Sequence, residues 1–254
     1  MMDSERFDQA IRLRDAGRAE DALREFVELE EHTSDPEGKA SMLGNQASCL
    51  AILGRHQEAM QKLILARRIA PKTQIHLYLD FQEAGLLQQT GEFEKALKIL
   101  DDLQRYYKGV LTAPEHEDLN VRTQIFRGVS LVALRRYREA RAALEGCLNF
   151  HLGAKDERHV LFNLGVCYNS LGERDLAKET LQGVLQKGLQ GANAVSAHYF
   201  LGTIYFSEKA YAKALMELEW CLAHVEEGRI PKKHICDWLV SLGKTLGLKD
   251  NEYE

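Results

Sequence analysis

Proline is scarce in this chain, which has 4 among 254 residues. No stretch alternates apolar and polar residues over enough positions to indicate a strand of a sheet. Hydrophobic residues make up 45% of the composition, which is enough for a substantial core. We therefore expect an all-helical protein.

Long apolar runs are also absent. No run reaches the roughly 18 apolar residues that indicate a membrane-spanning helix. The first residues, Met1 to Arg6, are charged from the third position onward, and no apolar segment of a secretory signal follows them. These features predict a cytoplasmic protein with no membrane span.

Positive charge is not in excess. Lysine and arginine number 33 against 38 aspartates and glutamates, so the net charge is −5 and the pI is about 6.0. Proteins that bind nucleic acid need a basic surface to neutralise phosphates. The charge balance therefore argues against a nucleic-acid partner.

The sequence has no HExxH, GxxxxGK[ST], GxSxG or CxxC motif. No two histidines are four residues apart. One loop places His116 beside Glu115, Glu117 and Asp118, but structural zinc sites use four well-placed ligands that are mostly Cys or His. We expect no enzymatic activity, no cofactor and no metal site.

Against these absences stands a long internal repeat. Six alanines recur with steps of 37, 37, 44, 37 and 37 residues, namely Ala22, Ala59, Ala96, Ala140, Ala177 and Ala214. A fixed period of this length is typical of an array of stacked helical units. The longer step indicates an insertion of seven residues near residues 110–120.

Other repeat positions agree with the alanines. Twelve residues before each alanine lies a small residue, in the order Ala10, Ala47, Ala84, Gly128, Gly165 and Gly202. Four residues after it lies a large one, in the order Phe26, Leu63, Leu100, Leu144, Leu181 and Leu218. Small side chains let two helices approach closely, and large ones fill the space between layers.

A turn position lies five residues before each alanine and is occupied by Gly17, Gly54, Gly91, Arg135, Gly172 and Lys209. Glycine accepts the left-handed backbone that ends a helix. If Arg135 and Lys209 adopt the same backbone, each carries a strain of about 1 kcal/mol.

This pattern resembles the tetratricopeptide repeat, a helix–turn–helix unit of about 34 residues. The unit at 40–73 is closest, with Leu43, Ala47, Leu50, Gly54, Ala59, Leu63, Ala66 and Pro71 at family positions. The repeat as a whole departs from the family in two ways. Its period is longer, and no unit has the family's tryptophan at position four, where three units have Arg6, Asp80 and Gln124. The resemblance implies an all-α, right-handed α-α superhelix, or solenoid.

We expect one domain over 1–254, built of six hairpins and a capping helix. The hairpins are predicted at about 3–32, 40–73, 77–110, 121–154, 158–191 and 195–228. The capping helix is predicted at 231–247, where Ile235, Trp238, Leu239 and Leu242 fall at helical spacing. Repeat arrays need such a helix to cover the open end of their core.

In the family, the first helix of each hairpin lines a concave groove through its positions two, five, nine and twelve. Carried over, these positions predict a ligand groove formed by Phe7, Ile11, Tyr78, Phe81, Ile125, Val129, Phe162, Asn169, Tyr199 and Phe206. We call these ten residues the first-helix column. Apolar groups exposed in a groove indicate a binding site, but the same residues can instead pack between neighbouring helices. The sequence leaves both open.

The resemblance implies a non-enzymatic module that binds a peptide or protein segment with apolar anchors. Two alternatives remain: a structural scaffold that assembles as a homo-oligomer, and a peptide-sensing regulator. Members that bind chaperones hold a chain-terminal carboxylate with lysines, asparagines and an arginine. Asn45 and Asn163 stand at one such position, but the supporting cations are missing, which argues against this carboxylate clamp.

Overall fold

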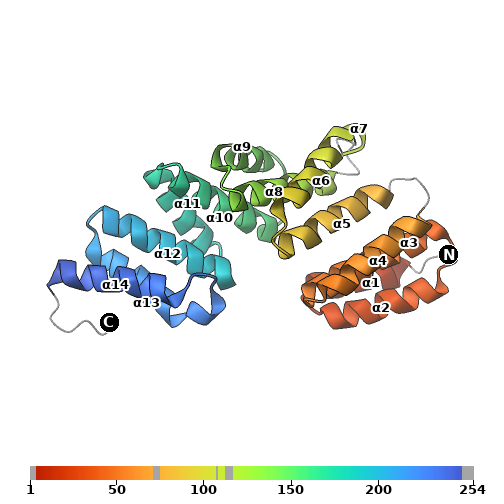
Figure 1. Ribbon diagram of the computed structural model, residues 1–254, viewed down its shortest axis with the longest axis horizontal. Helices are drawn as coiled ribbons and strands as arrows, with labels where there is room; N and C mark the ends of the chain where they lie inside the picture. Colours follow the sequence, from red (N-terminus) through yellow and green to blue (C-terminus); the bar gives the residue numbers. More distant parts are fainter. Residues whose placement is uncertain (1–3, 71–74, 107, 112–116, 248–254) are drawn as a thin grey trace. The chain divides into compact units, whose positions relative to one another are not determined.

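The computed structural model describes residues 4–70, 75–106, 108–111 and 117–247 (Figure 1). All regular secondary structure in these ranges is helical. The prediction of an all-α, helical-repeat fold is confirmed. The acidic loop around Pro114 and His116 and the tail from residue 248 lie outside the described residues.

The chain divides into two compact units, residues 1–134 and 135–254. The first contains α1 (Ser4–Asp15), α2 (Ala19–His32), α3 (Pro36–Ile52), α4 (His56–Ile69), α5 (Ile75–Gln89), α6 (Phe93–Tyr106), α7 (Lys108–Leu111) and α8 (Glu117–Ala133). The second contains α9 (Tyr137–Cys147), α10 (Ala154–Ser170), α11 (Arg174–Gln186), α12 (Gly191–Ser207), α13 (Tyr211–Ala223), a short 3₁₀ helix (Val225–Glu227) and α14 (Lys232–Leu246). The predicted fourth hairpin thus gives one helix to each unit, and a single continuous solenoid over 1–254 stays a prediction.

The repeat positions form the core of each unit. All six repeat alanines have no exposed surface, and the six large residues four positions later are at most 1% exposed. Gly165 shows why the position twelve residues earlier must be small. A Cβ atom added there would lie 2.6 Å from Leu181 Cδ2 on the paired helix. At Gly202 the corresponding distance to Leu218 Cγ is 2.8 Å.

The turns between paired helices use the left-handed backbone, as predicted. Gly17, Gly54, Gly91 and Gly172 have φ between +75° and +81°. Arg135 and Lys209 adopt it too, with φ of +58° and +62°. These two are the positive-φ residues other than glycine in the described part of the chain. Both therefore carry the backbone strain expected from the sequence.

Replacing Lys209 with glycine is expected to raise the free energy of unfolding by about 0.5–1 kcal/mol, because relief of the strain exceeds the added chain entropy of glycine. Lys209 is exposed, so its side chain loses little on removal. Urea unfolding followed by circular dichroism measures the change. A loss of stability would show that the lysine side chain contributes more than its backbone costs.

Arg6 and Asp80, two of the three polar residues at position four where the family has tryptophan, form ion pairs with a neighbouring helix. Arg6 Nη2 donates to Glu25 and Glu28 of α2, at 2.7 Å in each case. Asp80 of α5 pairs with Arg67 of α4 at 2.5 Å. These ion pairs replace part of the apolar contact that a large ring would make between helices.

The predicted capping helix is present as α14. Its Ile235, Leu239 and Leu242 are at most 1% exposed and join cores formed with α12 and α13. Trp238 is half-buried, and its Nε1–H donates to the Tyr199 hydroxyl at 3.1 Å. The helix ends at Gly247, which has a φ of +71°. The last hairpin of the second unit is thereby covered.

Candidate functional site

The first-helix column of the first unit contains side chains of different exposure. Tyr78 on α5 is 41% exposed, whereas Ile125 on α8 is 2% exposed. Phe7, Ile11, Phe81 and Val129 are half-buried. Phe7 packs edge-on against Phe26 at 5.9 Å between ring centroids, and Phe81 lies 4.8 Å from Phe126. Both rings therefore combine packing with a remaining accessible surface.

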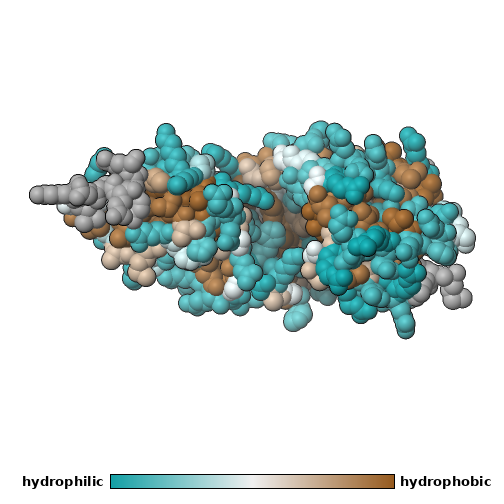
Figure 2. Space-filling model, turned by 90° about the horizontal axis from the view of Figure 1, so that it is seen from below, coloured by the Kyte–Doolittle hydropathy of each residue, from teal (hydrophilic) through white to brown (hydrophobic). Residues whose placement is uncertain are grey.

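In the second unit, Phe162 on α10 is 8% exposed and belongs to the core. Asn169, Tyr199 and Phe206 are half-buried. The Phe206 ring lies edge-on at 5.7 Å from Tyr211 and at 5.1 Å from Trp238. Buried Ile125 and Phe162 thus pack between helices, while the other column members keep part of their surface. Figure 2 shows that hydrophobic residues reach the surface of each unit in patches among hydrophilic ones.

Three polar residues outside the ten-residue column lie on first helices of the first unit, Arg14 on α1, Asn45 on α3 and Gln82 on α5. The Arg14 guanidinium donates to Asn45 Oδ1 at 2.8 Å and pairs with Asp15 at 2.9 Å. The side-chain oxygen of Gln82 is buried and accepts no hydrogen bond from a described residue. The repeat offers one signal for this set, since Gln82 occupies in its unit the position that Asn45 occupies in the preceding one.

The two asparagines considered for a carboxylate clamp are held by their own helices. Asn45 Nδ2 donates to the Ser41 carbonyl at 2.9 Å, and Asn163 Nδ2 donates to the His159 carbonyl at 2.8 Å. Arg14 places a cation beside Asn45, but Asp15 already pairs with it. Burial lowers the pKa of His159, so its imidazole is neutral at neutral pH and adds no cation beside Asn163.

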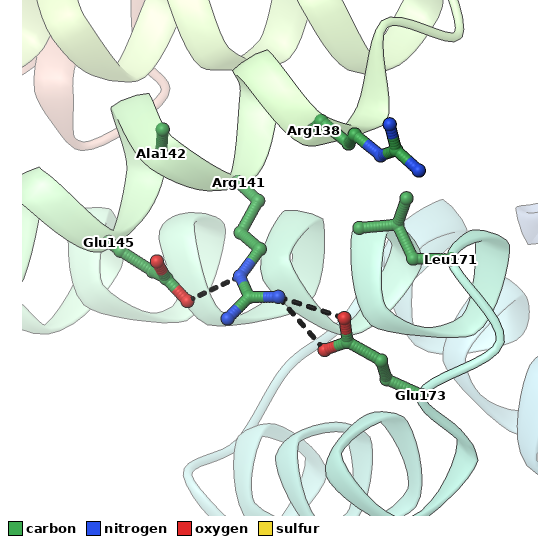
Figure 3. Close-up of a pocket in the computed structure, with 6 residues that line it drawn as sticks. All are labelled: Arg138, Arg141, Ala142, Glu145, Leu171 and Glu173. Carbon is green, nitrogen blue, oxygen red and sulfur yellow. Dashed lines mark hydrogen bonds and ion pairs between the residues drawn. The ribbon is translucent and has the colours of Figure 1, made fainter.

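A cavity of about 440 Å³ lies in the second unit between α9 and the turn from α10 to α11. Its lining, drawn in Figure 3, consists of Arg138, Arg141, Ala142, Glu145, Leu171 and Glu173. Arg141 donates to Glu145 at 2.8 Å and to both carboxylate oxygens of Glu173 at 2.8 and 3.1 Å. Arg141 and Glu145 lie on α9, and Glu173 lies in the turn between α10 and α11. Because the opposite charges of this cluster neutralise one another, we assign it the role of holding α9 to the following hairpin.

Four of the five thiols are buried. Burial raises the pKa of Cys49, Cys147 and Cys167 to about 11 and that of Cys221 to about 12. Buried thiols with such pKa values stay protonated and unreactive at neutral pH. All five cysteines are free. Within the described ranges, no three His, Cys, Asp or Glu side chains gather as metal ligands.

None of the described helices is long and apolar enough to cross a membrane.

The sequence matches two family models, both described as tetratricopeptide repeat, over residues 7–72 and 159–187. No curated protein matches the sequence. Several solved structures share the fold. One chain of the APC/C hetero-tetramer Cut9-Hcn1 aligns with a TM-score of 0.70 and 19% identity over 93% of this chain. The present chain spans 42% of that chain's length.

The quorum sensor NprR from B. thuringiensis, in its apo form, aligns with a TM-score of 0.66 and 16% identity, covering 96% of this chain and 77% of NprR. NprR in complex with its cognate peptide NprX gives a TM-score of 0.62 and 15% identity, covering 98% and 74%. At these identities the likeness establishes the fold.

Proposed function

The chain is a tetratricopeptide repeat protein, and from this premise we propose that it is a non-enzymatic interaction module. It holds a peptide or protein segment with apolar anchors against the first helices of its hairpins. We also propose a cytoplasmic location, which is supported by five free thiols, four of them buried.

The observation that carries the proposal is the partly exposed apolar surface of the first-helix column. Tyr78, Phe81 and Val129 come from two successive first helices, α5 and α8, and keep accessible surface there. Covering apolar surface contributes about 25 cal/mol per Å².

The structural likenesses support the same class of function. NprR shares this fold and has been solved with its cognate peptide bound, and the matched chain of the Cut9-Hcn1 structure is part of a hetero-tetramer. The argument from these proteins is one of fold-level analogy. The residues that would make the contacts are argued from this chain alone.

The test is selection of peptides from a random display library, followed by fluorescence anisotropy of a selected peptide. We expect apolar anchors in the selected peptides and a loss of affinity of about tenfold or more in Tyr78→Asp, because a carboxylate there would lose its water when the ligand covers it.

Met216→Asp is the matched control, because Met216 is 70% exposed on α13 and lies outside the column. It should bind the peptide like the unaltered protein. Equal affinity of folded Tyr78→Asp and the control would remove Tyr78 from the binding surface. Failure to select any peptide would contradict the proposed function.

A further inference from the structure

The outward side of α4 carries an apolar pair that nothing in its own unit covers. Ala59, Leu63 and Ala66 are at most 1% exposed and join α4 to the core with α3 and α5. On the other side lie Gln57, Gln61, Ile64, Leu65 and Arg68, all exposed, which we call the outer stripe of α4. Residues spaced three and four apart share one helix face, so these five form a continuous surface.

The centre of the outer stripe is unusual for this protein. Ile64 and Leu65 are 46% and 43% exposed and adjacent. In the described part of the chain, no other helix carries more than one exposed large hydrophobic residue. Single exposed apolar residues are ordinary, whereas a contiguous patch bordered by polar groups indicates an interaction surface.

Charges of opposite sign flank the apolar pair. Arg68 follows it and makes no hydrogen bond or ion pair with any other described residue. Glu58 lies at the beginning of α4, where it is paired with Arg55 at 2.7 Å but remains exposed. A helix face with acid before an apolar centre and base after it is complementary to itself when two copies run antiparallel.

We propose that a second copy of this chain docks on the outer stripe of α4 through a two-fold axis. The two helices run antiparallel, so that Ile64 and Leu65 cover the same two residues of the other copy. Arg68 then lies beside Gln61 of the other copy and one turn from its Glu58. A two-fold contact of this kind uses the same patch on both partners and closes at the dimer.

Antiparallel pairing follows from the charges. A parallel pair would place Arg68 against Arg68, and like charges in contact disfavour association. The apolar centre is small, since it has two large side chains per copy, so the dimer belongs to the weak class of interfaces. It is expected to dissociate on dilution.

Sedimentation velocity over about 1 μM to about 500 μM tests the association, a range that reveals a dimer of micromolar affinity. We expect the weight-average mass to rise from monomer toward dimer. The variant Ile64→Asp/Leu65→Asp should stay monomeric, and Met216→Asp should dimerise like the unaltered protein. A monomer at every concentration would overturn the proposal.

A charge exchange tests the geometry. Glu58→Arg and Arg68→Glu should each weaken dimerisation about tenfold, because each places like charges within one turn of each other across the interface. An equimolar mixture of the two variants should recover it, because every new charge then faces its opposite on the other copy. Circular dichroism verifies that both variants fold. If the mixture stays as weak as either variant alone, the antiparallel two-fold arrangement is wrong.

Discussion

Replacing Gly165 with valine is expected to lower the free energy of unfolding of the second unit by about 3 kcal/mol, because overpacking a tight core costs up to that amount. Gly165 on α10 faces Leu181 on α11, and an added Cβ would lie 2.6 Å from Leu181 Cδ2 and 2.8 Å from its Cγ. Leu181 has no exposed surface, so the added valine side chain meets a residue that is already packed. Urea denaturation followed by circular dichroism measures the loss.

Gly183 supplies the matched control, since it lies in α11 with no atom within 4 Å of its ideal Cβ. Gly183→Val should leave stability unchanged or slightly higher, because glycine is a poor helix former. The steric cause is tested by adding Leu181→Ala to Gly165→Val. The double variant should lose less than the sum of its single variants, since each change makes room for the other. Strict additivity would show that the helices part instead of clashing.

Replacing Phe26 with alanine is expected to destabilise the first hairpin by about 3–5 kcal/mol, the usual cost of deleting a buried aromatic ring. Phe26 has no exposed surface and packs against the Phe7 ring. Its backbone carbonyl accepts a hydrogen bond from Gln46 Nε2 at 3.2 Å, and this bond does not depend on the ring. The loss is therefore one of packing.

Phe26 belongs to a core cluster formed by residues of α1, α2 and α3, so we expect the damage to stay in that part of the first unit. Hydrogen–deuterium exchange should show faster exchange in α1 and α2 and unchanged exchange in the second unit. Val27→Ala alters the next residue, which is 37% exposed, and should change stability by less than about 0.5 kcal/mol. Equal effects of the two variants would contradict the burial of Phe26.

The sequence predicted the pairing of helices because that pairing depends on residues whose size alone matters. Each unit has alanine or glycine at fixed positions and a large residue four positions after its repeat alanine. This arrangement leaves few ways to pack two helices. The repeat register also placed Arg135 and Lys209 where the other units have the turn glycine, and the structure shows that both adopt the left-handed backbone of that glycine. The helix α14 was predicted from the helical spacing of its apolar residues.

The candidate surface was less predictable. Phe81 and Phe162 occupy the same repeat position, yet Phe81 is half-buried and Phe162 is only 8% exposed. The difference comes from neighbours that the repeat does not specify: Phe162 lies inside a core cluster with Ala197 and Leu201, whereas Phe81 packs against the edge of its cluster. The hydrogen bond between Arg14 and Asn45 joins residues from different hairpins, and no local sequence pattern predicts it.

By itself the sequence determined the repeat register, the helical class and the residues that hold paired helices together, because these follow from side-chain size at fixed spacing. Only the tertiary structure decided which column residues remain accessible, which charges pair between hairpins, and that the outward side of α4 is left uncovered. The exposure and the ion pairing of a side chain depend on the side chains of the neighbouring helices. Those side chains come from residues far away in the sequence.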